Sequence, residues 1–437
     1  MEVMQAIPQA LPPCRMIRNK VIQGGACVGI FLSPLLSGAQ TWEVFDMVTA
    51  GFPSNTVRAL SPDSSGNMWV GTDWGLCRFD GTDWTVYQTG NSGLPENDIR
   101  SLAVAPNGDL WIGTALYGLV VHDGTNWEVF STQNSPLPDD QINCITFDHR
   151  GWAWIGTVGG LVCHTGTEWR VYNDQSTSYN GLVLNGNHIR DVAVAPDGLV
   201  AFGTINGGFH YLTDTAVQVH ATYIDMFPDN TQYGVLIDTL ANERWLACPA
   251  GGLLRQGGAW NGGPWFQYTT FNSQIPSNAL TCIVQDGFSR LWIGSQLNGL
   301  ILREPNGDYS LFNTGTSGIP DNSVERLCFA PDGSLWVATF FGGAARFTFD
   351  VGIHGESQFD RSLHVFPNPT DGPVRVATEG LAAGSEWRVM DAVGRVLRSG
   401  RTDAAQLTFD IRGSAPGLYG LVIGDPDGPR SVWFQLY

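Results

Sequence analysis

The sequence predicts an all-β protein: a seven-bladed β-propeller with three-plus-one strand closure, followed by a small C-terminal β-sandwich. The main observation is a short apolar motif, most often Trp-x-Gly-Thr, which recurs seven times at steps of 42 to 47 residues. The motif starts at Trp69, Trp111, Trp154, Ala201, Trp245, Trp292 and Trp336. A repeat of roughly 40–50 residues is typical of propellers and solenoids.

The second observation is the content of one repeat, which is clearest over residues 99–130. Apolar stretches at 99–104, 110–114, 118–122 and 127–130 have strand length, and turn sequences such as Pro-Asn-Gly and Asp-Gly separate them. No stretch keeps a 3.6-residue apolar period, so we expect no helix in the repeats. Four short antiparallel strands per repeat make a propeller blade.

The third observation concerns closure of the ring. Seven second strands occur, but only six are followed by a fourth strand, because the last repeat ends with a third strand at 343–349. Near the N-terminus, Trp42-Glu43-Val44-Phe45 almost repeats the Trp-Glu-Val-Phe of residues 127–130. We therefore expect the N-terminal strand to complete the last blade, which removes exposed sheet edges.

Two recurring residue types have structural explanations. Trp at one position of most second strands indicates packing between blades, because burying an indole favours folding by up to ~5 kcal/mol. A glycine opens each third strand, as at Gly75, Gly118, Gly160 and Gly252. We expect these glycines at positive φ, where they have little steric cost.

The pattern I-x-x-L, D/N-G-x-L-W-I-G-T, G-L and a terminal aromatic strand resembles the repeats of the two-component regulator propeller family. The resemblance covers about residues 40–349. That family commonly forms the periplasmic sensor of hybrid histidine kinases. No kinase sequence follows here, so sensing would need a separate receptor.

The N-terminal segment has the pattern of a secretory signal peptide over residues 1–39. Arg15, Arg18 and Lys20 precede an apolar run, and Ser37-Gly38-Ala39 resembles a cleavage site that would leave Gln40 first. The true start could be Met16. We expect no integral membrane segment after cleavage, because the run is too short for a spanning helix.

The composition excludes several functions. The formal net charge is −18, and removing the basic leader makes it about −20, which disfavours nucleic acid and anionic membranes. Lys20 is the only lysine, so the mature chain cannot use lysine chemistry. Six cysteines remain after cleavage. Buried free thiols are the favoured interpretation, with disulfides as the alternative.

The repeat pattern ends at a polar linker, residues 350–362, and residues 363–437 form the predicted sandwich. Its motifs resemble the type A C-terminal sorting domain of type IX secretion. The motif residues are Pro367, Asn368, Pro369, Gly372, Gly394, Gly417 and Tyr419. The resemblance implies a Bacteroidetes-type bacterium, the type IX secretion machinery as a partner, and delivery to the surface or medium. An ordinary accessory sandwich is the alternative.

No catalytic motif stands out, and we predict no catalytic residue, cofactor or metal site. One antibiotic-lyase family has a similar seven-bladed propeller, but no residue set here reproduces its active site. The favoured function is a non-catalytic, monomeric, exported propeller that binds an extracellular ligand such as a glycan or peptide. A polysaccharide- or antibiotic-degrading enzyme and a sensor acting through a separate receptor remain as alternatives.

The candidate binding face carries the loops between second and third strands and the loops between blades. Side chains on the first set differ between blades, unlike the repeated Trp: Trp74, Tyr117, Asn206, Asn298, Phe340 and Phe341. The second residue of each first strand reads Arg58, Arg100, Asn143, Arg190, Gly234, Thr281 and Glu325. If it points into the channel mouth, the arginines could bind a carboxylate or sulfate; alternatively they pair with Glu325 or neighbouring carboxylates.

Overall fold

The structure is a computed structural model. It describes residues 40–175, 178–239, 241–258 and 263–349. In the C-terminal part it describes 365–366, 373–377, 384–391, 396–402, 406–414, 417–423 and 430–436. The expected signal peptide and linker lie outside the described residues.

The described chain from 40 to 349 forms seven four-stranded antiparallel sheets, as the repeats predicted. The first three sheets are β2 (Val57–Pro62), β3 (Met68–Thr72), β4 (Gly75–Phe79), β5 (Trp84–Tyr87); β6 (Ile99–Val104), β7 (Leu110–Thr114), β8 (Leu119–His122), β9 (Trp127–Phe130); and β10 (Ile142–Phe147), β11 (Ala153–Thr157), β12 (Leu161–His164), β13 (Trp169–Tyr172).

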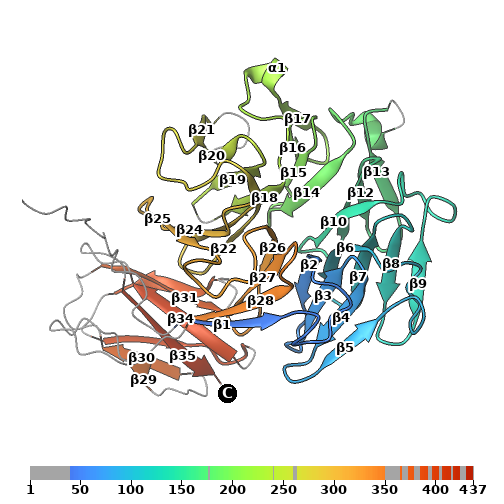
Figure 1. The fold of residues 1–437 in the computed structure, drawn as a ribbon. Coiled ribbons are helices and arrows are strands. Elements are labelled where there is room, and N and C mark those ends of the chain that lie inside the picture. The colour runs from blue at the N-terminus through green and yellow to red at the C-terminus, as the bar shows by residue number, and fades with distance from the viewer. Residues whose placement is uncertain are drawn as a thin grey trace, which may run out of the picture. The chain divides into compact units, whose positions relative to one another are not determined.

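The next three sheets continue the same order. They are β14 (Ile189–Val194), β15 (Val200–Thr204), β16 (Phe209–Leu212), β17 (Val217–His220); β18 (Gly234–Asp238), β19 (Glu243–Cys248), β20 (Gly252–Gly257), β21 (Trp265–Tyr268); and β22 (Leu280–Gln285), β23 (Leu291–Ser295), β24 (Leu300–Arg303), β25 (Tyr309–Phe312). The first strand of each sheet contacts the first strand of the next, so these strands are the innermost of the propeller (Figure 1).

The seventh sheet closes the ring with both ends of the repeat region. It consists of β26 (Val324–Phe329), β27 (Leu335–Thr339), β28 (Ala344–Phe349) and the N-terminal β1 (Gln40–Phe45), which pairs antiparallel with β28. Trp42 lies opposite Phe347, with ring centroids 4.6 Å apart. The predicted three-plus-one closure is confirmed, and β26 also contacts β2 of the first sheet.

The core of the propeller lies between neighbouring sheets. One cluster joins the first and second sheets through residues such as Trp69, Ile99 and Ile112. The repeated Trp is buried at five of its six positions, whereas Trp111 is only partly buried and packs against Phe147. These contacts account for the repeated tryptophan as core packing.

Glycine is required where each third strand begins. Gly118 has φ of 85°, and a Cβ there would lie 2.1 Å from the carbonyl oxygen of Phe130. Gly75, Gly160 and Gly252 also have positive φ, as expected. A side chain would therefore both strain the backbone and separate the third strand from the fourth.

The loops between blades share a hydrogen bond that the sequence analysis missed. In each loop a backbone N–H near its start donates to an Asn or Asp side chain near its end, with lengths of 2.7–2.9 Å. The acceptors are Asn55, Asn97, Asp140, Asn187, Asn230, Asn278 and Asn322. This bond fixes loops that would otherwise lack regular structure.

The expectation of no helix in the repeats was wrong in two of these loops. The 3₁₀ helix η1 (Tyr179–Gly181) and the α-helix α1 (Thr222–Asp225) lie in the loops on either side of the fourth blade. Both are single turns without a side-chain cap, too short to leave an apolar period in the sequence. No helix in the described part of the chain is long and apolar enough for a membrane span.

The C-terminal part forms two small sheets. One contains β29 (Val365–Phe366), β30 (Pro373–Ala377) and β33 (Gln406–Asp410); the other contains β31 (Glu386–Asp391), β32 (Val396–Arg401), β34 (Gly417–Ile423) and β35 (Arg430–Leu436). One hydrophobic cluster takes residues from both sheets, including Val374 and Phe409 from the first and Trp387 and Leu421 from the second. The two sheets therefore pack face to face, as the predicted sandwich requires.

The six described cysteines are free thiols, which agrees with the favoured interpretation. Five are buried, and Cys328 is partly buried. Burial raises the pKa of each thiol; for Cys77 it reaches about 12. The thiols behave as small apolar core groups, since their reactive thiolate form is disfavoured.

Candidate functional site

A β-bulge shapes the entrance to the central channel. In six of the seven first strands the pairing register shifts between the first and third residues, as between Val57 and Ala59. The second residue of the strand is therefore left out of the ladder. Bulges commonly redirect side chains near functional sites. Here they place consecutive side chains of a strand, such as Glu325 and Arg326, against one cavity.

This cavity has a volume of about 210 Å³ and is lined by polar and charged side chains. Its lining contains Arg58, Arg100, Gln141, Asn143, His188, Arg190, Ile205, Tyr233, Glu325 and Arg326. The structure thus brings together five of the seven residues that the sequence analysis placed at the channel mouth; Gly234 and Thr281 do not line the cavity. Burial and the charge of Arg190 lower the pKa of His188, which favours the neutral form of its ring.

The fifth blade required a correction of one residue. The sequence alignment placed Gly234 at the second position of its first strand. In the structure Gly234 lies opposite Ala247, just as the third-position Ala59 lies opposite Gly71. The second position therefore belongs to Tyr233, whose side chain lines the cavity. The absence of an apolar first residue in this blade had obscured the alignment.

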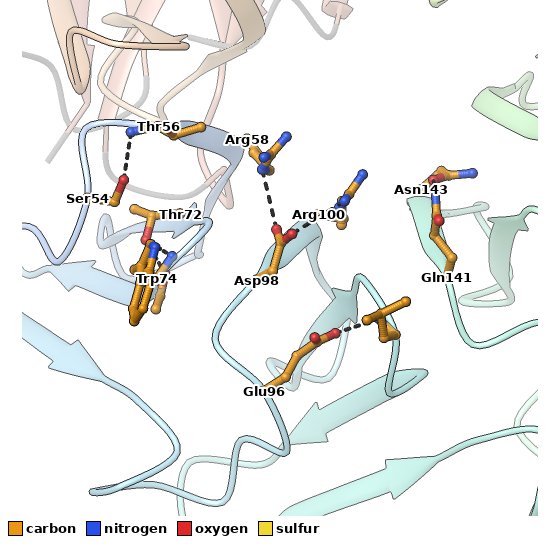
Figure 2. A network of polar contacts seen from close by, with 12 residues as sticks. Ser54, Thr56, Arg58, Thr72, Trp74, Glu96, Asp98, Arg100, Gln141 and Asn143 are labelled. Carbon is orange, nitrogen blue, oxygen red and sulfur yellow. Dashed lines mark hydrogen bonds and ion pairs between the residues drawn. The ribbon is translucent and has the colours of Figure 1, made fainter.

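Arg58 and Arg100 share one carboxylate (Figure 2). The two Asp98 oxygens lie 3.3 Å from Arg58 Nε and 3.3 Å from Arg100 Nη2, respectively. The Arg58 guanidinium also lies 5.9 Å from the centroid of the Phe340 ring. These two arginines are therefore partly neutralised and held in place, which matches the alternative that they pair with a neighbouring carboxylate.

Arg190 has a different environment. No residue in the described part of the chain forms a hydrogen bond or ion pair with its side chain, and its guanidinium lies 5.1 Å from the centre of the Tyr233 ring. Burial, and secondly the charge of Arg326, lower the pKa of Arg190 to about 10. The side chain remains protonated at neutral pH. The charges of Glu325 and Asp191 stabilise it, but neither carboxylate forms an ion pair with it, so its positive charge faces the cavity.

Arg326 and Asp191 occupy the third position of their strands, and the sequence analysis missed both. The other blades have Ala59, Ser101, Cys144, Gly234 and Cys282 there. Arg326 Nη1 donates to the Glu325 carbonyl oxygen at 3.1 Å, and Asp191 accepts a hydrogen bond from Val235 N at 2.7 Å. Burial raises the pKa of Asp191. Charged residues at a position that is otherwise small were the available signal.

Two second-position side chains connect blades. Asn143 Nδ2 donates to the carbonyl oxygen of Ile189 at 2.8 Å, and Thr281 Oγ1 donates to that of Val324 at 2.6 Å. Each bond joins neighbouring first strands. Thr281 does not line the cavity. Asn143 does line it, but one of its amide hydrogens is already used in the bond to Ile189.

The loop aromatics fall into two groups. Trp74, Tyr117 and Phe341 are 61%, 53% and 71% exposed, whereas Phe340 is partly buried against Phe341. The exposed side chains stand on braced loops: the Phe341 N–H, for example, donates to Asp321 Oδ2 at 2.8 Å. Trp74 N donates to Thr72 Oγ1 at 3.1 Å (Figure 2).

The other predicted residues are distributed as follows. Asn206 and Asn298 are exposed on the equivalent loops of the fourth and sixth blades, and Asn206 has a positive φ of 66°. Gln40 begins β1, Gly417 begins β34, and Tyr419 is buried in the C-terminal core. The remaining cleavage and sorting residues lie outside the described residues: Ala39, Pro367, Asn368, Pro369, Gly372 and Gly394. The described part of the chain contains no cluster suited to a metal ion.

The repeat pattern of a known family matches the sequence at the first three blades. The family is the two component regulator propeller, and the matched segments are residues 51–74, 93–115 and 136–159. These three segments carry two component regulator propeller repeats. Each matched repeat includes a first strand, a second strand and the loop after it, which are the elements that form the candidate face. No curated protein matches the sequence.

Several solved structures share the fold. PorZ, a surface component of the type-IX secretion system of Porphyromonas gingivalis, is 18% identical with a TM-score of 0.53, over 90% of this chain and 60% of PorZ. The extracellular domain of the putative hybrid two component system BT3049 from B. thetaiotaomicron is 18% identical with a TM-score of 0.58, over 88% of this chain and 53% of that one.

A third neighbour is virginiamycin B lyase from Staphylococcus aureus, in a catalytically inactive form with quinupristin. It is 14% identical with a TM-score of 0.56, over 71% of this chain and 99% of the lyase. The present chain spans little more than half the length of PorZ and the BT3049 domain. These similarities show the propeller fold that the repeats build.

Proposed function

We propose that this chain is an exported, non-catalytic propeller that binds an acidic glycan across the face carrying Trp74, Tyr117 and Phe341, with the channel mouth at its centre. The main support is that exposed aromatic rings on hydrogen-bonded loops occur together with a cavity lined by several arginines. These aromatics differ from blade to blade, so the packing of the repeats does not explain them.

The two kinds of side chain suit two parts of such a ligand. Flat aromatic faces pack against the apolar faces of sugar rings, and rings held on short loops lose little entropy on binding. Guanidinium groups bind carboxylates and sulfates through paired hydrogen bonds. In a chain of net charge −18, four arginines around one cavity are an unusual local concentration of positive charge.

Delivery through type IX secretion is the second part of the proposal. Its support is the order of sorting motifs after residue 362 and the signal-like segment at residues 1–39. PorZ belongs to a type-IX secretion system and shares the propeller fold, but at 18% identity it supports only the fold. Surface display or release would bring the candidate face into contact with extracellular polymers.

Binding is tested with the mature protein on an array of neutral and acidic oligosaccharides and peptides, with products checked by mass spectrometry. We expect an acidic glycan to bind without being chemically modified. Trp74→Ala or Phe341→Ala should weaken its binding by about 1–3 kcal/mol. Affinity should fall as salt rises, since the charge contacts are screened.

The matched control is Phe266→Ala, because Phe266 is 49% exposed on the outermost strand β21. This variant should leave the affinity unchanged. Equal loss in all three variants would contradict the assignment of the face. Covalent change of a bound glycan would favour the enzyme alternative, and binding of peptides alone would replace the glycan with a peptide.

A further inference from the structure

We infer that the channel mouth is an anchor for a single acid group, a carboxylate or a sulfate ester, bound by Arg190 and Arg326. Arg58 and Arg100 form the fixed wall of the same site. This inference rests on the proposed function only in that the acid group belongs to the ligand of that face. It assigns the binding charge to two specific arginines, one of which the sequence did not indicate.

The first argument is the balance of charge. The cavity lining contains four arginines and one glutamate, and Asp98 behind the lining offsets part of the charge of Arg58 and Arg100. The charges of Glu325 and Asp191 offset part of the charge of Arg190, but no ion pair comparable to that of Arg58 holds Arg190 among the described residues. Burying an unpaired cation is costly, and an anion in the cavity would remove much of that cost.

The second argument is the position of Arg326. It belongs to the seventh blade and Arg190 to the fourth, yet both side chains line the same cavity, and the charge of Arg326 lowers the pKa of Arg190. Two guanidinium groups from separate blades thus converge on one space. Their mutual repulsion opposes this arrangement in the free protein, whereas an acid group between them would reverse the sign of the interaction.

The third argument is size. A cavity of about 210 Å³ lies below the roughly 300–1,000 Å³ typical of sites that enclose a small molecule. It can take one acid group and the few atoms beside it. The rest of the ligand must lie outside, on the face that carries Trp74 and Phe341. The ligand therefore enters end-on or by a side group.

The fourth argument concerns Glu325, which also lines the cavity. Among the described residues, no group donates a hydrogen bond to its carboxylate, although its carbonyl oxygen accepts one from Arg326. The carboxylate would repel a second acid group and accept a hydrogen bond from a hydroxyl. A singly acidic group with neighbouring hydroxyls fits both features better than a doubly charged one.

The test measures binding of sodium glucuronate, sodium sulfate and an N-acetylated dipeptide acid to the full mature chain, with glucose as the neutral match for glucuronate. We expect glucuronate to bind and glucose not to bind. Arg190→Met should weaken glucuronate binding by about 10- to 100-fold, which corresponds to ~1.4–2.8 kcal/mol. Arg412→Met, which removes an exposed arginine of the C-terminal part, should change nothing.

Asp98→Asn provides the opposite change. It frees Arg58 and Arg100 from their shared carboxylate, so we expect tighter glucuronate binding and a steeper dependence on salt. Each variant is first compared with the unmodified protein by thermal unfolding. If Arg190→Met unfolds the chain, Arg190→Lys keeps the charge but loses the paired hydrogen-bond geometry, and a several-fold loss of affinity is then expected.

The outcomes separate the anchor from the wider binding face. Unchanged glucuronate affinity in folded Arg190→Met and Arg190→Lys proteins would overturn the anchor, whatever Trp74→Ala does. Loss in these variants, with no effect of Trp74→Ala on any oligosaccharide, would keep the anchor and refute the proposed face. Stronger binding of the dipeptide acid than of glucuronate would keep the anchor and identify a peptide carboxylate as the source of the acid group.

Discussion

Closure of the propeller by its N-terminal strand can be tested at one side chain, Phe45. The ring of Phe45 is 6% exposed and stacks on Trp336 at 5.1 Å. It also contacts Phe79 at 5.4 Å and Trp84 at 5.2 Å, both in the first blade. Phe45 therefore joins the last blade to the first. Replacing a buried Phe by Ala usually costs about 3–5 kcal/mol.

For a domain of this size, 1 kcal/mol corresponds to roughly 2 °C in the melting temperature, so Phe45→Ala should lower it by ~6–10 °C. Differential scanning calorimetry of the mature chain measures this shift. Val48→Ala is the control, since Val48 follows in the next loop and is 90% exposed. Deletion of residues 40–46 should destabilise the ring further. If the deletion variant and Phe45→Ala both have the melting temperature of the unmodified protein, the three-plus-one closure contributes nothing to stability and our reasoning is wrong.

Two further predictions concern export and the thiols. Removal of residues 363–437 should leave the propeller folded but retained in the periplasm of a type IX secretion host, as fractionation would show; normal delivery to the surface or medium would refute the sorting interpretation. A thiol reagent at pH 8 should label the native mature chain slowly, because burial raises the pKa of Cys77 to about 12 and of Cys282 to about 11. After denaturation without reductant, the same reagent should label six thiols. Rapid native labelling, or fewer than six thiols, would contradict buried free cysteines.

The sequence was sufficient for the architecture because each blade repeats the same packing. Trp69 and its equivalents mark the second strands. The near identity of residues 42–45 and 127–130 was enough to place the closing strand. The short helices η1 and α1 could not be predicted, because a single turn has no period to detect.

The channel mouth was predictable only in part. The shared second position of the first strands singled out Arg58, Arg100 and Arg190, but the bulge that brings Arg326 to the same cavity is a pairing irregularity without a distinct residue signature. The role of Asp98 was also hidden. It lies in a loop, and its proximity to both arginines follows from the path of that loop between blades.

The second-position residues also remove the rotational degeneracy of the propeller. A ring of seven identical blades would offer a ligand in its channel seven equivalent orientations. Here the first, second and fourth blades present arginines, the fifth a tyrosine and the seventh a glutamate. The third and sixth use their side chains to join neighbouring strands. If the channel mouth binds an acid group as proposed, a molecule with one such group would be held in a single orientation, although the scaffold around it is repetitive.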